Sequence, residues 1–283
     1  MTGVIAGPEA DLHAARTAFA RTVRAEVVRM VHRARASHVG GALSMVDILA
    51  VLYGPDGRLR VRAHDPQWPE RDRFILSKGH ACTGLYATLA LAGFFPVAAL
   101  DRYALDDSLL MSHASHHVAG VELSTGSLGH GLPVACGLAF GARARSSPSR
   151  TVVLLSDGEL DEGSNWEAIL FAGHHRLDRL RIIIDANRIQ SLGAVADVLN
   201  LEPLGDKFRA FGWHVCDVDG HDIAALDAAL DLDAAPTPGQ PTAVIARTVK
   251  GKGVSFMEGS IAWHYKSPSD AQLEAALAEI EAA

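Results

Sequence analysis

The second half of the chain alternates short hydrophobic runs with segments of helical length. Strands are expected at 151–155, 181–185, 213–218 and 242–247, and helix-compatible segments separate them. Neighbouring parallel strands cannot be joined by a tight hairpin, so each long connection must cross a face of the sheet. The pattern predicts a doubly wound, mainly parallel α/β sheet flanked by helices.

The first half of the chain reads as helices around one further strand. The run "RFILS" at 73–77 has the length and composition of a short buried strand. Ser44 is placed to cap the N-terminus of a helix over "MVDILAVLY". Other helices are expected at 9–36, 79–95, 128–145, 162–176, 203–211 and 222–230.

The composition favours one large folded domain. With 48% hydrophobic and 21% charged residues, the chain can bury a sizeable core. The segment 233–241, "DAAPTPGQP", is too short for a domain linker and is typical of a surface loop. We therefore expect residues 1–283 to form a single domain.

Charge and hydropathy argue against two classes of partner. The formal net charge is −7, from 26 Lys and Arg against 33 Asp and Glu, which gives no basic surface for nucleic acid. No uninterrupted apolar run approaches the roughly 20 residues that span a bilayer. The start of the sequence shows no basic region followed by an apolar signal core. We expect a soluble, cytoplasmic protein without a membrane partner.

Oxygen-bearing side chains follow two consecutive predicted strands. Asp157 stands in "SDGE" after the first, and Asn187 stands in "DANRI" after the second. If these strands are neighbours, both side chains reach the crevice at the carboxyl edge of the sheet. With a main-chain carbonyl such as that of Ile189, they form a set of hard ligands suited to Mg²⁺ or Ca²⁺. Either turn alone is equally typical of an ordinary strand exit.

The same turns have the features of a phosphate site. Gly158 allows the backbone to approach a ligand closely, and a helix that begins near Glu162 would point free N–H groups at an anion. A metal held by only a few protein oxygens leaves positions open for phosphate oxygens.

The sequence "SDGELDEGSNWEA" followed by "IIIDANRIQSLG" resembles the thiamine diphosphate fingerprint of the transketolase family. Four further segments resemble transketolase segments in the family's order, and the resemblance covers nearly the whole chain from about residue 20. They are "SHVGGALSMVDILAVLY", "RDRFILSKGHACTGLYATLALAG", "GVELSTGSLGHGL" and "VKGKGVSFMEGSIAWHYKSP".

The resemblance implies roles for individual residues around the cofactor. Asp157, Asn187 and the carbonyl of Ile189 would hold Mg²⁺, with Ca²⁺ as a possible substitute, and Gly158 would lie against the diphosphate. The remaining positions with an implied cofactor contact are Gly126 and Leu128 at the aminopyrimidine, and Glu162, whose role is left open.

Four histidines fall on separate family motifs: His38, His80, His113 and His264. The resemblance implies that they converge on the donor ketose and the cofactor, with His80 close to the thiazolium and His264 also near the diphosphate. An unperturbed imidazole pKa of about 6.5 suits proton transfer near neutrality. Taken singly, each reads equally as a structural or surface histidine, since the chain has 14.

The sequence departs from the family pattern around one of these histidines. "SHA" at 112–114 replaces the usual Gly-His-Pro, which leaves the placement of His113 open. Ser156 replaces the glycine that usually precedes the Asp-Gly pair, without removing a ligand. Lys250 and Lys252, in "KGKG", fit phosphate contact and solvent exposure equally.

As a whole, the resemblance implies the N-terminal subunit of a split, two-chain transketolase. Such a subunit would be active only with a C-terminal partner chain that carries the pyrimidine-binding domain and the activating glutamate, as two copies of each chain. It would use thiamine diphosphate to transfer a two-carbon ketol unit from a ketose, expected to be phosphorylated, to an aldose acceptor.

Three alternatives are considered beside this one. The first is a transketolase-like subunit of a specialised-metabolism pathway. The second is a 2-oxo acid dehydrogenase α subunit, which is not expected to carry the four histidines together. The third is a non-catalytic scaffold subunit, and the presence of every matched metal ligand argues against it.

Overall fold

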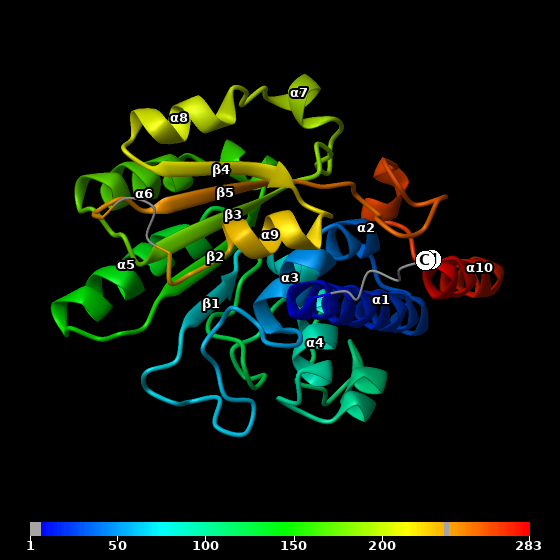
Figure 1. Cartoon of the computed structure of the whole chain (residues 1–283). Coiled ribbons are helices and arrows are strands. Elements are labelled where there is room, and N and C mark those ends of the chain that lie inside the picture. The colour runs from blue at the N-terminus through cyan, green and yellow to red at the C-terminus, as the bar shows by residue number, and fades with distance from the viewer. Residues whose placement is uncertain (1–6, 235–237) are drawn as a thin grey trace, which may run out of the picture.

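Five parallel strands form the sheet around which the chain is built, in the order β1-β2-β3-β5-β4 (Figure 1). The computed structural model describes residues 7–234 and 238–283. The strands are β1 (Arg73–Leu76), β2 (Thr151–Ser156), β3 (Leu180–Ala186), β4 (His214–Asp219) and β5 (Thr242–Arg247). The predicted α/β fold is confirmed, and all five carboxyl ends share one edge of the sheet.

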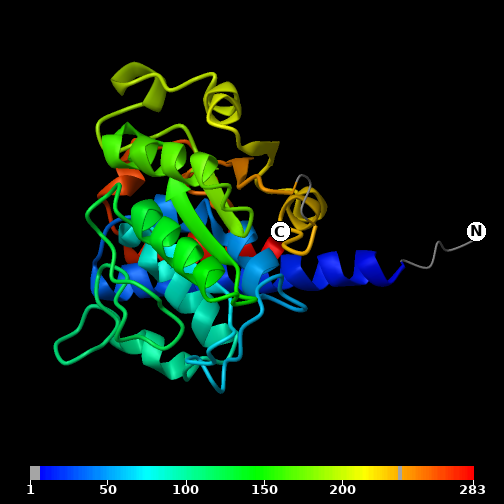
Figure 2. The same cartoon turned by 90° about the vertical axis from the view of Figure 1, so that its left-hand side faces the viewer.

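Helices cover both faces of the sheet. In Figure 2, α5 and α6 lie side by side on the face of the sheet that is turned to the viewer. On the same face, α8 lies next to β4. These helices are α5 (Gly131–Ala144), α6 (Gly163–His174) and α8 (Leu204–Ala210). The opposite face carries α1 (Pro8–Ala34), α3 (Val46–Tyr53), α4 (Cys82–Leu91) and α9 (Ile223–Ala229).

The strand order explains this division of helices. From β2 through β3 to β4 the chain moves in one direction across the sheet, and from β4 to β5 it returns. Because parallel crossovers are right-handed, the returning connection through α9 must lie on the opposite face from α6 and α8. Two hydrophobic cores result, one on each face of the sheet.

Strand residues alternate between these two cores. Ile182 and Ile184 belong to the core beneath α5 and α6, whereas Ile183 belongs to the core beneath α1 and α3. Because both faces of the sheet are covered, β3 is buried along its whole length. This explains why its centre, residues 182–184, is a continuous hydrophobic run instead of an alternating one.

One capping prediction is wrong. Ser44 does not cap the helix that follows it, because α2 (Val39–Leu43) directly precedes it and the N-cap of α3 is Met45. The Ser44 hydroxyl instead donates to the Gly41 carbonyl and to Asp185 Oδ2, at 3.1 and 2.5 Å. The residue therefore connects α2 to the end of β3.

Three helices lay outside the prediction. They are α2, α7 (Val195–Val198) and α10 (Asp270–Ala282), of which α10 packs against α1 (Figure 1). The sequence does signal the start of α10, because Ser269 and Gln272 form a reciprocal capping box. Of the predicted loop 233–241, residues 235–237 lie outside the described part of the chain.

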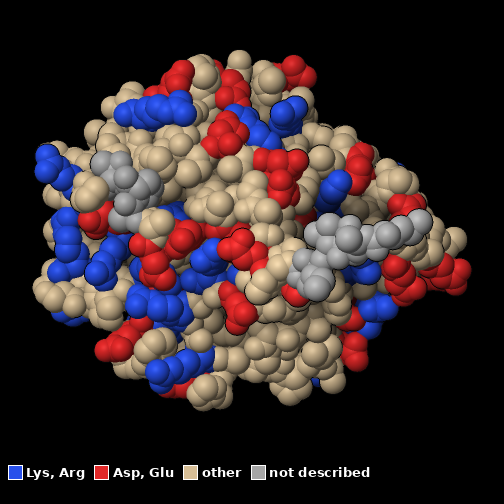
Figure 3. Space-filling model, viewed as in Figure 1, with Lys and Arg blue, Asp and Glu red and all other residues tan. Residues whose placement is uncertain are grey.

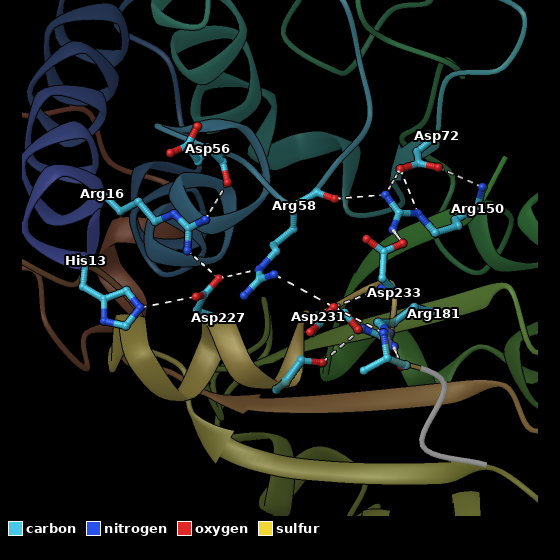
Figure 4. A network of polar contacts seen from close by, with 12 residues as sticks. His13, Arg16, Asp56, Arg58, Asp72, Arg150, Arg181, Asp227, Asp231 and Asp233 are labelled. Carbon is cyan, nitrogen blue, oxygen red and sulfur yellow. Dashed lines mark hydrogen bonds and ion pairs between the residues drawn. The ribbon is translucent and has the colours of Figure 1, made fainter. Parts of the chain in front are cut away.

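Charged side chains tie the helices to the amino edge of the sheet (Figure 4). Asp72, just before β1, accepts hydrogen bonds from the Arg150 guanidinium, just before β2. Asp227 of α9 pairs with Arg16 of α1 and with Arg58. On the surface viewed as in Figure 1, basic and acidic side chains are interspersed (Figure 3). Within the two described ranges, no helix is both long and apolar enough to cross a membrane.

Candidate active site

A cavity of about 220 Å³ opens at the carboxyl edge of the sheet. Its walls come from the segments that follow β1, β2, β3 and β5 and from α2. Ten of the eleven residues singled out from the sequence line this cavity: His38, His80, His113, Gly126, Leu128, Asp157, Gly158, Asn187, Ile189 and His264. The fold thus brings together segments from residue 38 to residue 264.

The three predicted metal ligands lie on the turns after β2 and β3, which pair directly. Asp157 and Asn187 are each 7% exposed. The two Asp157 oxygens accept hydrogen bonds from the main-chain N–H groups of Gly158 and Arg188, at 2.9 and 2.5 Å. Asn187 Oδ1 accepts from the N–H of Ile189 at 3.2 Å. A carboxylate, an amide oxygen and a main-chain carbonyl are therefore present together as hard donors.

The electrostatics at Asp157 fit a divalent cation. Burial, reinforced by the nearby Asp185 carboxylate, raises the Asp157 pKa to about 6. None of the ion pairs among residues 7–234 and 238–283 includes Asp157. A buried carboxylate without a paired cation is costly, and a bound metal would offset that cost.

Metal binding here would depend on mixed donors. Within the described residues, no group of three or more histidine, cysteine or carboxylate side chains is arranged to hold a metal ion. A cation in this cavity would therefore also need the amide and main-chain oxygens of Asn187 and Ile189. Such oxygen donors suit Mg²⁺ or Ca²⁺ and not a softer metal.

Lys250 is buried in the site. Its ammonium donates to the Ile189 carbonyl at 2.8 Å and lies 3.0 Å from Nδ1 of His264. Burial, with a contribution from the nearby Lys78, lowers its pKa to about 8. Of the two alternatives for this lysine, the structure supports the one in which it faces the cavity. Lys252 instead lies near Glu258 in an ion pair.

The four histidines lie close together in the cavity. The His38 ring centroid lies 5.1 Å from that of His80, 6.1 Å from that of His113 and 5.1 Å from that of His264. His38 precedes α2 with a left-handed backbone, φ 72°, and its N–H donates to the His264 carbonyl at 2.9 Å. That bond joins two motifs more than two hundred residues apart.

The cavity makes these imidazoles weaker bases than free histidine. Burial, followed by the charges of neighbouring groups that include Lys250, lowers the pKa of His38 and of His264 to about 4. Burial, with Lys78 and the other imidazoles, also lowers the pKa of His80. At neutral pH the three rings are therefore neutral and can each donate one hydrogen bond and accept another.

The altered loop around His113 is held firmly. Tyr86 donates its hydroxyl to the His113 carbonyl at 2.8 Å, and the N–H of Ala114 donates to the Gly79 carbonyl at 3.1 Å. The imidazole packs over Gly126, where an added Cβ would lie only 2.9 Å from His113 Cδ2. The change from Gly-His-Pro to Ser-His-Ala therefore leaves the ring directed into the cavity.

Glu162 is the exception among the singled-out residues. It is exposed at the N-cap of α6 and does not line the cavity. A Cβ added at Gly129 would lie 2.7 Å from Glu162 Cβ and 3.2 Å from Glu162 Cγ. Its contact with a cofactor stays a prediction.

Three buried charged residues of the site were not singled out from the sequence. Lys78 and Asp185 form an ion pair, and Glu159 accepts hydrogen bonds from Ser77 Oγ and from the N–H of Gly129, at 2.5 and 3.0 Å. Lys78 and Glu159 line the cavity. All three belong to the quoted motifs "SKGHA", "SDGE" and "DAN", so their position in the sequence was a usable signal.

The fold and this cavity define an α/β protein with an oxygen-rich pocket that also holds two buried ammonium groups and four neighbouring imidazoles. The family model described as "Transketolase, thiamine diphosphate binding domain" matches residues 15–278. The chain therefore belongs to the transketolase family, as the sequence predicted, and forms its thiamine diphosphate-binding domain.

Individual relatives agree with this assignment. The chain is 40% identical over 263 residues to the 6-deoxy-6-sulfo-D-fructose transketolase subunit of Clostridium sp. strain MSTE9, covering 93% of this chain and 94% of that protein. It is 44% identical over 267 residues to an apulose-4-phosphate transketolase subunit of Actinobacillus succinogenes, with the same coverage. It superimposes on the transketolase from Leishmania mexicana with a TM-score of 0.88 and 29% identity, covering 94% of this chain and 41% of that structure.

Proposed function

We propose that this chain is the diphosphate-binding half of a two-chain transketolase, which transfers a two-carbon ketol unit from a ketose to an aldose. The observation that carries the proposal is the convergence of four imidazoles beside the Asp157, Asn187 and Ile189 oxygens in one cavity. The family assignment supplies the cofactor class, and the arrangement of side chains supports the reaction.

Within this proposal, Asp157, Asn187 and the Ile189 carbonyl hold Mg²⁺, and Ca²⁺ can replace it. Gly158 lines the cavity and lies against the diphosphate in this proposal; the turn has no room for a side chain there, because an added Cβ would meet Gln190 Cβ at 2.7 Å. Lys250 neutralises part of the phosphate charge. Because its ammonium already lies on the Ile189 carbonyl, it is placed to pass from that oxygen to a phosphate oxygen when a metal binds.

The histidines orient the sugar and carry protons. Bound thiamine diphosphate supplies a nucleophilic carbanion and an electron sink for carbon–carbon cleavage. The neutral rings of His38 and His264 bind sugar hydroxyls. Nδ1 of His264 accepts from the Lys250 ammonium, so its Nε2–H is left to donate to the sugar, and Nδ1 of His38 lies 2.9 Å from Ser37 Oγ. His113 and His80 line the same cavity, so the substrate is held on several sides. An anionic ligand would raise the pKa of these imidazoles and make proton uptake easier.

A partner chain completes the site. Relatives of this length are named as subunits, and the chain covers 41% of the transketolase structure from Leishmania mexicana. Exposed apolar side chains flank the residues that line the cavity: Leu192 follows Ser191, Ile261 and Tyr265 lie around His264, and Met111 precedes His113. We propose that the chain carrying the pyrimidine-binding domain and the activating glutamate covers these side chains, in an assembly with two copies of each chain.

The proposed substrates are a ketose donor and an aldose acceptor with an anionic end group. The matched subunits are named for apulose 4-phosphate and for 6-deoxy-6-sulfofructose, so this architecture serves sugars that carry phosphate or sulfonate. These names also favour the specialised-metabolism version of the proposal. We further propose a cytoplasmic location, because a phosphorylated sugar does not cross a lipid bilayer unaided.

Calorimetric titration tests the proposal. Thiamine diphosphate with Mg²⁺ is titrated into the chain alone and into the chain mixed with its candidate partner, and the mixture is then supplied with phosphorylated ketose donors. Binding that tightens sharply in the mixture, disappears in Asp157→Ala and is followed by ketol transfer would support the proposal.

The opposite results have distinct meanings. Binding without cleavage of any ketose would favour the scaffold alternative, and decarboxylation of a 2-oxo acid would favour the dehydrogenase alternative. Absence of binding in both preparations would overturn the assignment of the cation site.

A further inference from the structure

A buried ion pair spans the floor of the cavity. Lys78 lies two residues beyond the end of β1, and its ammonium pairs with Asp185 Oδ2 near the end of β3. The two side chains are 1% and 0% exposed. Since β2 lies between β1 and β3, the pair crosses a strand. Because buried ion pairs contribute little net stability, a stabilising role does not by itself explain why this pair is present.

The Asp185 carboxylate is saturated with donors. Its Oδ2 accepts from Lys78 and from Ser44 Oγ, the latter at 2.5 Å, and its Oδ1 accepts from the Thr248 hydroxyl. A fourth donor is the side-chain amide of Asn187, whose Nδ2 lies 3.3 Å from Oδ2. Asp185 is thereby held by residues from α2 and from the ends of β1 and β5.

This carboxylate determines which end of the Asn187 amide faces the cation site. An ionised carboxylate only accepts hydrogen bonds, so it attracts the amide nitrogen and repels the amide oxygen. The oxygen must then turn away from Asp185, where it accepts from the N–H of Ile189. A flipped amide would place an NH₂ group, which cannot bind a cation, at the metal position.

Lys78 has a second effect, on charge. Without it, Asp185 would be a second buried carboxylate beside Asp157. With it, Asp185 is neutralised and Asp157 is the one carboxylate among the three proposed metal ligands. A metal bound by one carboxylate and neutral oxygens is held weakly until phosphate oxygens complete its shell.

We propose that Lys78 and Asp185 are a positioning pair for the metal site: Asp185 orients the Asn187 amide, and Lys78 withholds the Asp185 charge from the metal so that tight binding requires the cofactor diphosphate. This inference rests on the proposed function. It concerns two residues that bind neither metal nor substrate themselves, and it predicts opposite effects for their removal.

The test uses the chain assembled with its partner and Mn²⁺ as a probe that electron paramagnetic resonance detects when free. Asp185→Asn, which permits the flipped amide, weakens Mn²⁺ binding at saturating thiamine diphosphate by about tenfold or more. Lys78→Met tightens Mn²⁺ binding measured without the cofactor, because the Asp185 charge is no longer neutralised. The double variant Lys78→Met, Asp185→Leu removes charge and orientation together and binds Mn²⁺ weakly with or without cofactor.

A matched control comes from the opposite edge of the sheet. Asp72, just before β1, is a buried carboxylate that pairs with Arg150, just before β2 (Figure 4). Asp72→Asn therefore removes a comparable ion pair far from the cavity. Its urea midpoint should fall while Mn²⁺ binding stays unchanged. If Asp185 had only a structural role, Asp185→Asn would likewise lower the urea midpoint and leave Mn²⁺ binding unchanged.

The outcomes separate the two hypotheses. No Mn²⁺ binding by the unmodified pair of chains, with or without cofactor, overturns the proposed function itself. If the unmodified chains bind Mn²⁺ and Asp185→Asn binds it with an affinity within twofold of theirs, the orienting role of Asp185 is overturned. Unchanged or weaker cofactor-free binding in Lys78→Met overturns the charge argument. If Asp185→Asn does not fold, the Lys78→Met measurement decides alone.

Discussion

Replacing Asp157 by asparagine is expected to stabilise the cofactor-free chain while it abolishes metal binding. Burial and the Asp185 carboxylate raise the Asp157 pKa from 3.8 to about 6. Each unit of such a shift corresponds to about 1.4 kcal/mol, so the ionised carboxylate costs about 3 kcal/mol at pH 8. Asparagine avoids that cost but forfeits one of the two main-chain hydrogen bonds, at about 1 kcal/mol. The net gain in unfolding free energy is about 2 kcal/mol.

The sign of the pH dependence follows from the direction of the shift. Because the folded pKa is above the unfolded value of 3.8, the folded state holds the proton more tightly between these two values. The unfolding free energy lost to ionised Asp157 has its full value above the folded pKa. It decreases as the pH falls and disappears below the unfolded pKa of 3.8. The advantage of Asp157→Asn therefore decreases on acidification, and at pH 5 the electrostatic part is about half of its value at pH 8.

Urea denaturation of the cofactor-free chain at pH 8 and at pH 5 measures this difference. Asp47→Asn is the matched control, because hydrogen bonds and charge interactions with His221 and Arg24 hold the Asp47 pKa below its usual value despite burial. That variant should be less stable than the unmodified chain at pH 8. The reasoning is refuted if Asp157→Asn is no more stable at pH 8, or if its advantage grows at pH 5.

Three further predictions concern the walls of the cavity. Gly126→Ala should displace the His113 ring, whose Cδ2 lies 2.9 Å from the added Cβ, and lower kcat by about tenfold to a hundredfold; unchanged turnover would contradict the placement of that ring. In nuclear magnetic resonance titrations of the cofactor-free chain, His38 and His264 should stay neutral down to about pH 4, and titration near 6.5 would show that they are not buried as described. The Lys250 pKa of about 8 predicts that cofactor affinity falls as the pH rises above 8. Lys250→Met should bind thiamine diphosphate more weakly, and its affinity should not depend on pH in this way. An identical pH profile in both proteins would exclude a role for the Lys250 charge.

The sheet was predictable because its determinants are local. The strand predicted at 242–247 matches β5 (Thr242–Arg247), because a strand buried on both faces has a continuous hydrophobic centre, here residues 243–246. Ser44 was misassigned for the opposite reason. Its sequence context fits an N-cap, yet its hydroxyl bonds to a carboxylate 141 residues away that no local pattern reveals.

The same distinction holds within the site. Asp157 and Asn187 could be predicted to meet, because each follows a strand and consecutive strands are often neighbours. The convergence of His38 with His264 required the family resemblance, since one precedes α2 and the other lies in the short helical turn Ile261–His264. No rule of spacing joins those two segments.

Within "DAN", sequence alone does not explain why the proposed metal ligand is the amide and not the carboxylate. Residues 185 and 187 are two apart, so in an extended chain both side chains point to the same side. The difference arises from Lys78, which pairs with Asp185 across β2 and leaves the neutral amide of Asn187 for the cation site. The lysine follows the strand β1 and the amide follows the strand β3. In this proposal the choice of ligand therefore depends on a contact between the ends of two non-adjacent strands, which only the folded chain brings about.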